Sequence, residues 1–188
     1  MNDIIKRNIS GRKISVLFIL TNILYVIMLT ITIPKVMSYA GGMNLPDKMP
    51  AGYSAGYVNS LLNNLGEKGR DVYLYNQIPL DMIYPFLFGT TYCLLLAFII
   101  NKLGKKESNL FYLCYIHLFA GLFDYFENIG IIMLLVSYPD NAIILSRTTN
   151  IFSFLKSTFT TISFIILIIC LIALVLKLIG SNSKIKIN

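Results

Sequence analysis

The chain has 188 residues, of which 56% are hydrophobic and only 13% carry a charge. Soluble proteins carry about 25% charged residues, so this composition excludes an ordinary soluble domain as well as a disordered or collagen-like chain. Three isolated cysteines do not provide the framework of a disulfide-stapled secreted domain. The length suits one domain, and we expect residues 1–188 to form a single membrane domain.

Four apolar stretches of the sequence are long enough to cross a membrane. A hydrocarbon core about 30 Å thick requires roughly 20 apolar residues in a helix. We therefore expect membrane-spanning helices at 14–34, 78–101, 110–138 and 151–177. The predicted fold class is all-α: a polytopic membrane protein whose four helices form an up-down bundle. The first stretch exceeds the core of a cleaved signal peptide, so we expect it to be retained as a helix.

The basic residues are distributed unevenly between the two sides of this bundle. Ten of the sixteen lysines and arginines lie in the N-terminal segment, the second loop and the tail, whereas five lie in the other two loops. Basic residues favour the cytoplasmic side, so we expect a multi-pass protein of the plasma membrane with both termini in the cytoplasm. The net charge of +7 then reflects topology and contact with membrane lipids, and no nucleic-acid partner is predicted.

The outer loop at 35–77 is the one sizeable segment outside the membrane. Ser54 is placed to cap a helix at about 54–66, and Gly66 is placed to end it. One face of this helix carries the apolar side chains of Tyr57, Val58, Leu61, Leu62 and Leu65. Such an amphipathic helix would lie over the mouth of the bundle as a lid, either as a plain cover or as the gate of a site beneath it.

Ionisable residues inside the apolar segments are the sharpest feature of the sequence. At 1.5 Å per residue, Asp81, Glu127 and Lys156 reach a similar depth in the outer third of the membrane, and Asp124 lies about one turn deeper. Intramembrane charges are costly, so they usually face the bundle interior and find partners there. We predict a ligand or cation pocket formed by Asp81, Tyr84, Asp124, Glu127, Asn128 and Lys156, with Gln77, Arg70 and His117 in support.

Two local patterns give this pocket its expected geometry. Asp124 and Glu127 are three residues apart on one helix, so both carboxylates can point into the same space. Pro85 lacks an N–H group, so the carbonyl of Asp81, four residues earlier, loses its partner within the helix. An acid and a freed carbonyl at one position are suited to hydrogen bonding or to a cation.

The charges of the cluster do not balance. Three carboxylates and one ammonium would carry a net charge of −2, which is unfavourable in a medium of low dielectric. One carboxyl could stay protonated, an arginine such as Arg70 could reach in from a loop, or a cation could bind at Asp81, Asp124 and Glu127. The sequence contains no zinc, haem or nucleotide signature.

Two stretches of the chain resemble small bacterial four-helix integral membrane proteins. The first runs from Gly52-Tyr53-Ser54 through Arg70 to Pro79-Leu80-Asp81-x-x-Tyr84-Pro85, and the second is Ala120-Gly121-Leu122-Phe123-Asp124-x-x-Glu127-Asn128. The resemblance covers about a third of the chain. It implies a four-helix membrane fold and carries no activity with it.

Three functions remain open at this point. The first hypothesis is an outward-facing polar pocket that binds or conducts a small ligand or cation. The second is a membrane enzyme that does acid–base chemistry on a lipid or isoprenoid through Asp124 or Glu127. The third is an accessory or structural subunit that uses the outer loop to bind a partner membrane protein or another copy of itself. A purely structural interpretation stands beside them: Asp81 caps its helix, Lys156 reaches outward, and the other polar groups join the helices.

Overall fold

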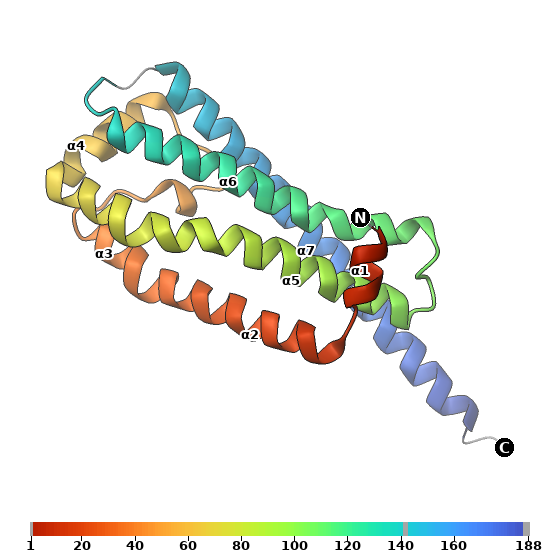
Figure 1. Cartoon of the computed structure of the whole chain (residues 1–188). Coiled ribbons are helices and arrows are strands. Elements are labelled where there is room, and N and C mark those ends of the chain that lie inside the picture. The colour runs from red at the N-terminus through yellow and green to blue at the C-terminus, as the bar shows by residue number, and fades with distance from the viewer. Residues whose placement is uncertain (1, 141–142, 186–188) are drawn as a thin grey trace.

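The chain folds into a bundle of long helices (Figure 1). The computed structural model describes residues 2–140 and 143–185, and every regular element in these two ranges is helical. Four helical segments are long and apolar enough to cross a membrane: Gly11–Met37, Ala55–Lys102, Asn109–Val136 and Ile143–Gly180. The predictions of an all-α chain and of four such segments are confirmed.

The first long segment is built from three helical pieces. A short helix α1 (Asn2–Asn8) precedes α2 (Gly11–Ile27), which continues through a π-helical turn η1 (Met28–Thr32) into α3 (Ile33–Met37). The predicted span at 14–34 falls inside this segment.

The second long segment begins in the outer loop. Helix α4 (Ala55–Val72) runs through a π-helical turn η3 (Tyr73–Gln77) into α5 (Ile78–Lys102). The Ser54 hydroxyl accepts a hydrogen bond from the Tyr57 N–H at 3.1 Å, which confirms the predicted cap. Gly66 adopts φ 61°, so the chain bends at the predicted point. The first helix of α4 ends at this non-helical residue (ψ −177°), as predicted, and a second helix follows at once and continues into α5.

The third and fourth segments follow with short connections. A 3-10 turn η4 (Asn109–Cys114) leads into α6 (Tyr115–Val136), and α7 spans Ile143–Ile185. Helix α7 extends beyond the fourth predicted span, 151–177, at both ends. Residues 143–150 are helical although several are polar, and the hydroxyls of Thr148 and Thr149 bond the carbonyls four residues earlier, within the same helix.

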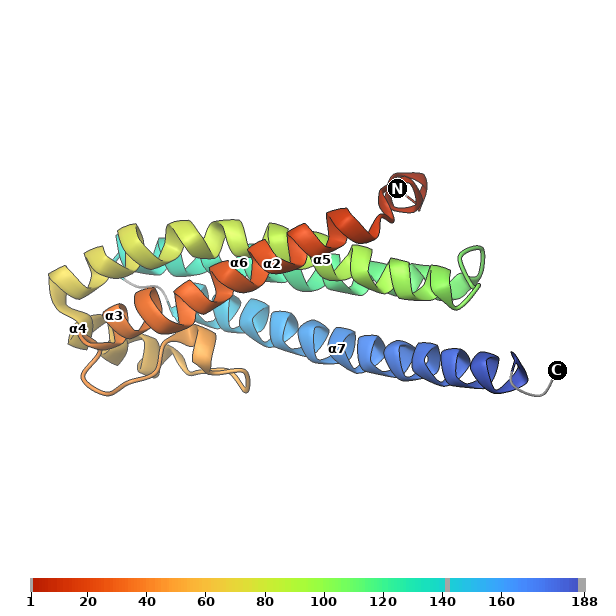
Figure 2. The same ribbon diagram turned by 90° about the horizontal axis from the view of Figure 1, so that it is seen from below.

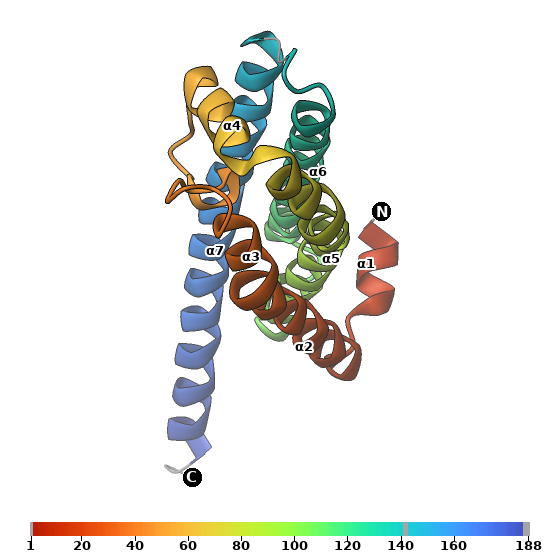
Figure 3. The ribbon, with the colours of Figure 1, turned by 90° about the vertical axis from the view of Figure 1, so that its left-hand side faces the viewer.

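The packing order of the long helices is α2, α5, α6, α7. Viewed along the bundle in Figure 3, α5 and α6 lie side by side, with α2 along α5 and α7 along α6. Small residues permit the closest approaches. A Cβ on Gly121 would lie 2.7 Å from the carbonyl oxygen of Pro85, and one on Gly130 would collide with Thr149. Glycine therefore sets both the α5–α6 and the α6–α7 separations.

The two ends of the bundle differ. Helix α1 and the C-terminal turns of α7 lie at one end, while α4 and the loop before it lie at the other (Figure 2). The apolar face of α4 is buried in the core of that outer end, where Val58, Leu61 and Leu65 share one cluster with Met28 and Leu134. Many apolar side chains of α7 are exposed along its length, as expected for a surface that faces lipid: Ile165, Ile168, Ile169, Leu171, Ile172, Val175 and Leu176.

Candidate functional site

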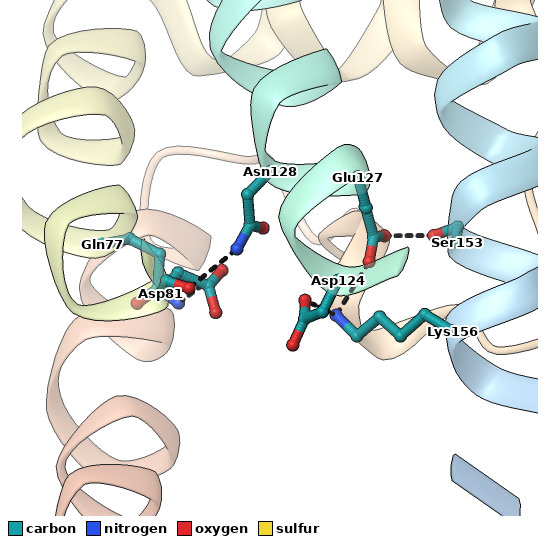
Figure 4. A network of polar contacts seen from close by, with 7 residues as sticks. All are labelled: Gln77, Asp81, Asp124, Glu127, Asn128, Ser153 and Lys156. Carbon is teal, nitrogen blue, oxygen red and sulfur yellow. Dashed lines mark hydrogen bonds and ion pairs between the residues drawn. The ribbon is translucent and has the colours of Figure 1, made fainter. Parts of the chain in front are cut away.

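One lysine lies between two carboxylates in the half of the bundle that is nearer to α4. The ammonium Nζ of Lys156 on α7 is 2.8 Å from Asp124 Oδ1 and 2.8 Å from Glu127 Oε2, both on α6 (Figure 4). The side chains of Asp124 and Glu127 are only 6% and 1% exposed, and that of Lys156 is 21% exposed. The structure thus brings together three predicted pocket residues. The alternative in which Lys156 reaches outward is wrong, since its ammonium is turned inward.

A serine forms a hydrogen bond with the second carboxylate oxygen of Glu127. The Ser153 hydroxyl donates to Glu127 Oε1, the carboxylate oxygen that does not face Lys156. Ser153 precedes Lys156 by three residues, so both side chains lie on the same face of α7. Sequence reasoning missed Ser153. The signal in the sequence was a row of small polar residues three or four positions apart, Ser146, Thr149 and Ser153, all of which are buried in the structure.

A second group of polar contacts surrounds Asp81 on α5. The amide Nδ2 of Asn128 donates to the Asp81 carbonyl oxygen at 2.7 Å, the carbonyl that Pro85 leaves without an intrahelical partner. Gln77 Nε2 donates to Asp81 Oδ2 at 3.4 Å, and the Thr32 hydroxyl donates to Gln77 Oε1. Asp81 does not cap its helix, because the chain is already helical before it in η3.

A cavity of about 360 Å³ lies between these two groups, bordered by α2, α5, α6, α7 and the outer loop. Four of the six predicted pocket residues line it: Asp81, Tyr84, Asp124 and Lys156. Glu127 and Asn128 lie behind this wall, where they hold Lys156 and the Asp81 carbonyl. This volume is in the range of small-molecule sites.

Aromatic rings cover much of the remaining wall of this cavity. Tyr84 stacks on Tyr25 of α2 with ring centroids 5.5 Å apart, and Phe88 lies between Tyr84 and Tyr92 at 5.8 and 4.9 Å. Phe164 of α7 meets Tyr92 edge-on at 5.2 Å. The cavity therefore joins a charged end, at Asp81, Asp124 and Lys156, to an aromatic body.

The outer loop contributes differently from what the sequence predicts. Lys48 and Pro50, which precede the amphipathic helix, border the cavity. Helix α4, expected at about 54–66 as a lid, covers the outer end of the bundle and is not part of the cavity wall.

Two residues predicted in support lie elsewhere. Arg70 donates to the Leu62 carbonyl at 2.9 Å and places its guanidinium 4.2 Å from the Tyr138 ring centre, so it braces the bend of α4 at Gly66. Its predicted role beside the acidic cluster is wrong, because its charge is engaged at the bend. His117 is fully buried about two turns from Asp124, with its ring stacked on Tyr92 at 6.0 Å, and it does not line the cavity. Gln77, the third, does contact Asp81.

The arrangement of the carboxylates bears on the predicted cation site. Asp124 and Glu127 converge on the Lys156 ammonium, whereas Asp81 is held by Gln77 on the α5 side. Among the residues that the structure describes, no three histidine, cysteine, aspartate or glutamate side chains are grouped so that they could hold a metal ion. The polar side chains that border the cavity can form hydrogen bonds and ion pairs. Comparison of the chain with protein-family models, with curated proteins and with solved structures finds no match.

Proposed function

We propose that this protein is a four-helix integral membrane protein whose intramembrane cavity binds a small organic ligand. The observation that carries the proposal is the position of the ion-paired cluster: Lys156 and Asp124 border a cavity of about 360 Å³. Burying charges costs several kcal/mol per ion even when they are paired. A cluster that served only to join helices could be enclosed entirely by packed side chains, whereas this one faces a space of ligand size.

The membrane placement rests on the helices and their ends. Four helical segments are long and apolar enough to cross a membrane, and many of their apolar side chains are exposed. Helix α1 and the C-terminal turns of α7 lie at the same end, which is also the end with the excess of basic residues. The positive-inside rule assigns that end to the cytoplasm and the cavity to the outer part of the plasma membrane.

The wall of the cavity favours an organic ligand over an inorganic cation. The Lys156 ammonium already occupies the space between Asp124 and Glu127. The rings of Tyr25 and Phe88 offer contact area to an apolar body. A ligand that fits this wall has an apolar body, which contacts the aromatic rings, and a polar group, which forms hydrogen bonds with the carboxylates.

Two matched threonines of α7 allow a direct test. Thr161 lines the cavity and Thr148 does not, yet both are exposed and both donate to the carbonyl four residues earlier. We expect Thr161→Phe to narrow the cavity and Thr148→Phe to leave it unchanged. The experiment screens a library of small amphiphilic fragments for compounds that raise the unfolding temperature of the purified protein, followed by circular dichroism.

A fragment that occupies the cavity stabilises the protein by about 2.7 kcal/mol at one hundred times its Kd. This stabilisation should appear in the wild type and in Thr148→Phe and should be lost in Thr161→Phe. Fragments that stabilise all three proteins equally, or a screen without any stabilising fragment, would contradict the proposal.

Conduction is tested separately, in liposomes loaded with a sodium-sensitive or pH-sensitive dye. We expect wild type and Asp124→Asn to leak no faster than protein-free liposomes, because Lys156 closes the acidic cluster to a cation. A sodium or proton flux that Asp124→Asn abolishes would assign conduction to the cluster in place of ligand binding.

A further inference from the structure

A second cavity, of about 370 Å³, lies toward the end of the bundle opposite α4. It is formed where α1 crosses α5, and its residues belong to α1, α2, α5 and α6: Ile4, Ile5, Asn8, Lys13, Leu17, Thr90, Cys93, Leu94 and Leu118. None of them takes part in the polar cluster. Among the described residues, the wall is apolar apart from Asn8, Thr90 and Lys13, and of these Lys13 alone carries a charge.

The register of α2 against α5 shows how this cavity is oriented. Thr21 on α2 and Thr91 on α5 share a hydrogen bond of 2.7 Å between their hydroxyls, so these two residues lie at the same level. Thr90 is therefore level with the middle of α2. Lys13 precedes Thr21 by eight residues, which places it about 12 Å further toward the basic end. The cavity thus has a cationic rim at the membrane edge and an apolar interior that extends inward.

The cationic rim is held in place by α1. Lys13 Nζ donates to Asn8 Oδ1 at 3.1 Å, which keeps the ammonium beside the opening. Helix α1 is itself fixed to the bundle, since Lys6 pairs with Glu107 at 2.5 Å and lies over the ring of Phe111. The neighbouring Arg12 is exposed and does not line the cavity.

We propose that this cavity binds one acyl chain of an anionic phospholipid, with the lipid phosphate paired to Lys13. A phospholipid has the same polarity along its length as the cavity: an anionic head at the membrane edge and an apolar chain that points inward. Basic pockets between helices on the cytoplasmic side are suited to anionic headgroups. This inference rests on the membrane placement proposed above and not on ligand binding in the first cavity.

The test compares two lipids and three variants. Purified protein is mixed with phosphatidylglycerol or phosphatidylcholine of identical acyl chains, and the lipid retained is measured by native mass spectrometry. We expect the wild type to retain phosphatidylglycerol about tenfold better, because both lipids carry the phosphate but only phosphatidylcholine also carries a choline cation, which repels the Lys13 ammonium. Lys13→Gln should abolish this preference, while Arg12→Gln, which removes the adjacent charge outside the cavity, should keep it.

The third variant tests whether a chain enters the cavity. Thr90→Phe keeps every charge and fills the interior, so we expect it to lower retention of both lipids. Equal losses in Lys13→Gln and Arg12→Gln would overturn the proposal in favour of diffuse attraction to a basic surface. Retention unchanged by Thr90→Phe would also overturn it. Fragment stabilisation that is intact in Lys13→Gln would show that the first cavity is independent, so the two proposals can fail separately.

Discussion

Replacing Lys156 by methionine removes the cation that holds two buried carboxylates. Both ion pairs are 2.8 Å long, and the carboxylate side chains are 6% and 1% exposed. These values belong to a buried ion pair, for which loss of one partner costs about 3–5 kcal/mol, and not to a surface pair worth at most about 1 kcal/mol. We therefore expect Lys156→Met to lower the free energy of unfolding by about 3–5 kcal/mol.

The assay is reversible unfolding in mixed micelles, with helicity followed by circular dichroism as the fraction of denaturing detergent rises. Lys48→Met is the matched control, because Lys48 also borders the cavity but is exposed. The triple variant Asp124→Asn, Glu127→Gln, Lys156→Met should recover most of the loss, since it removes all three charges of the ion-paired cluster and leaves neither Asp124 nor Glu127 as a buried anion without its cation. A loss below about 1 kcal/mol for Lys156→Met, or a triple variant no more stable than the single one, would refute the reasoning.

Two further predictions use the same unfolding assay. Asn128→Leu should lower the free energy of unfolding by about 1–3 kcal/mol, because it removes the donor to the buried Asp81 carbonyl. In a Pro85→Ala background the restored N–H should remove most of that cost, and an equal cost in both backgrounds would contradict this role. Gly130→Ala should lower the free energy of unfolding by about 1–3 kcal/mol by forcing α6 away from Thr149, and adding Thr149→Ala should recover part of this loss. An unchanged free energy of unfolding in Gly130→Ala would contradict the prediction, because it would show that the contact can relax.

The features that sequence reasoning predicted correctly are those that depend on local chemistry. A run of apolar residues must be helical in a membrane, because its backbone groups have no other partners there. The cap at Ser54 and the bend at Gly66 follow from one hydroxyl and one missing side chain. The contact between Glu127 and Lys156 follows from their similar predicted depth, and Asp124 joins them because it lies one helical turn from Glu127 on the same helix.

The features that it missed depend on which helix faces which. Ser153 donates to Glu127 only because α7 turns its small polar face to α6. Arg70 was expected at the acidic cluster, but the bend in α4 places the carbonyl of Leu62 close enough to accept a hydrogen bond from its guanidinium. The start of α7 at Ile143 was missed because average hydropathy does not distinguish a polar loop from a helix whose hydroxyls bond its own backbone.

Under the proposed membrane placement, the hydrogen bond from Asn128 to the Asp81 carbonyl has a consequence for how the protein would enter the membrane. With Pro85 in place, α5 by itself cannot satisfy its own backbone inside lipid, and the missing donor comes from α6. We expect α5 and α6 to insert together as a hairpin, joined by the short connection at 103–114. During synthesis α5, which carries the Asp81 carbonyl, is made just before α6, which carries the Asn128 amide. The carbonyl therefore gains its hydrogen-bond donor as soon as α6 inserts.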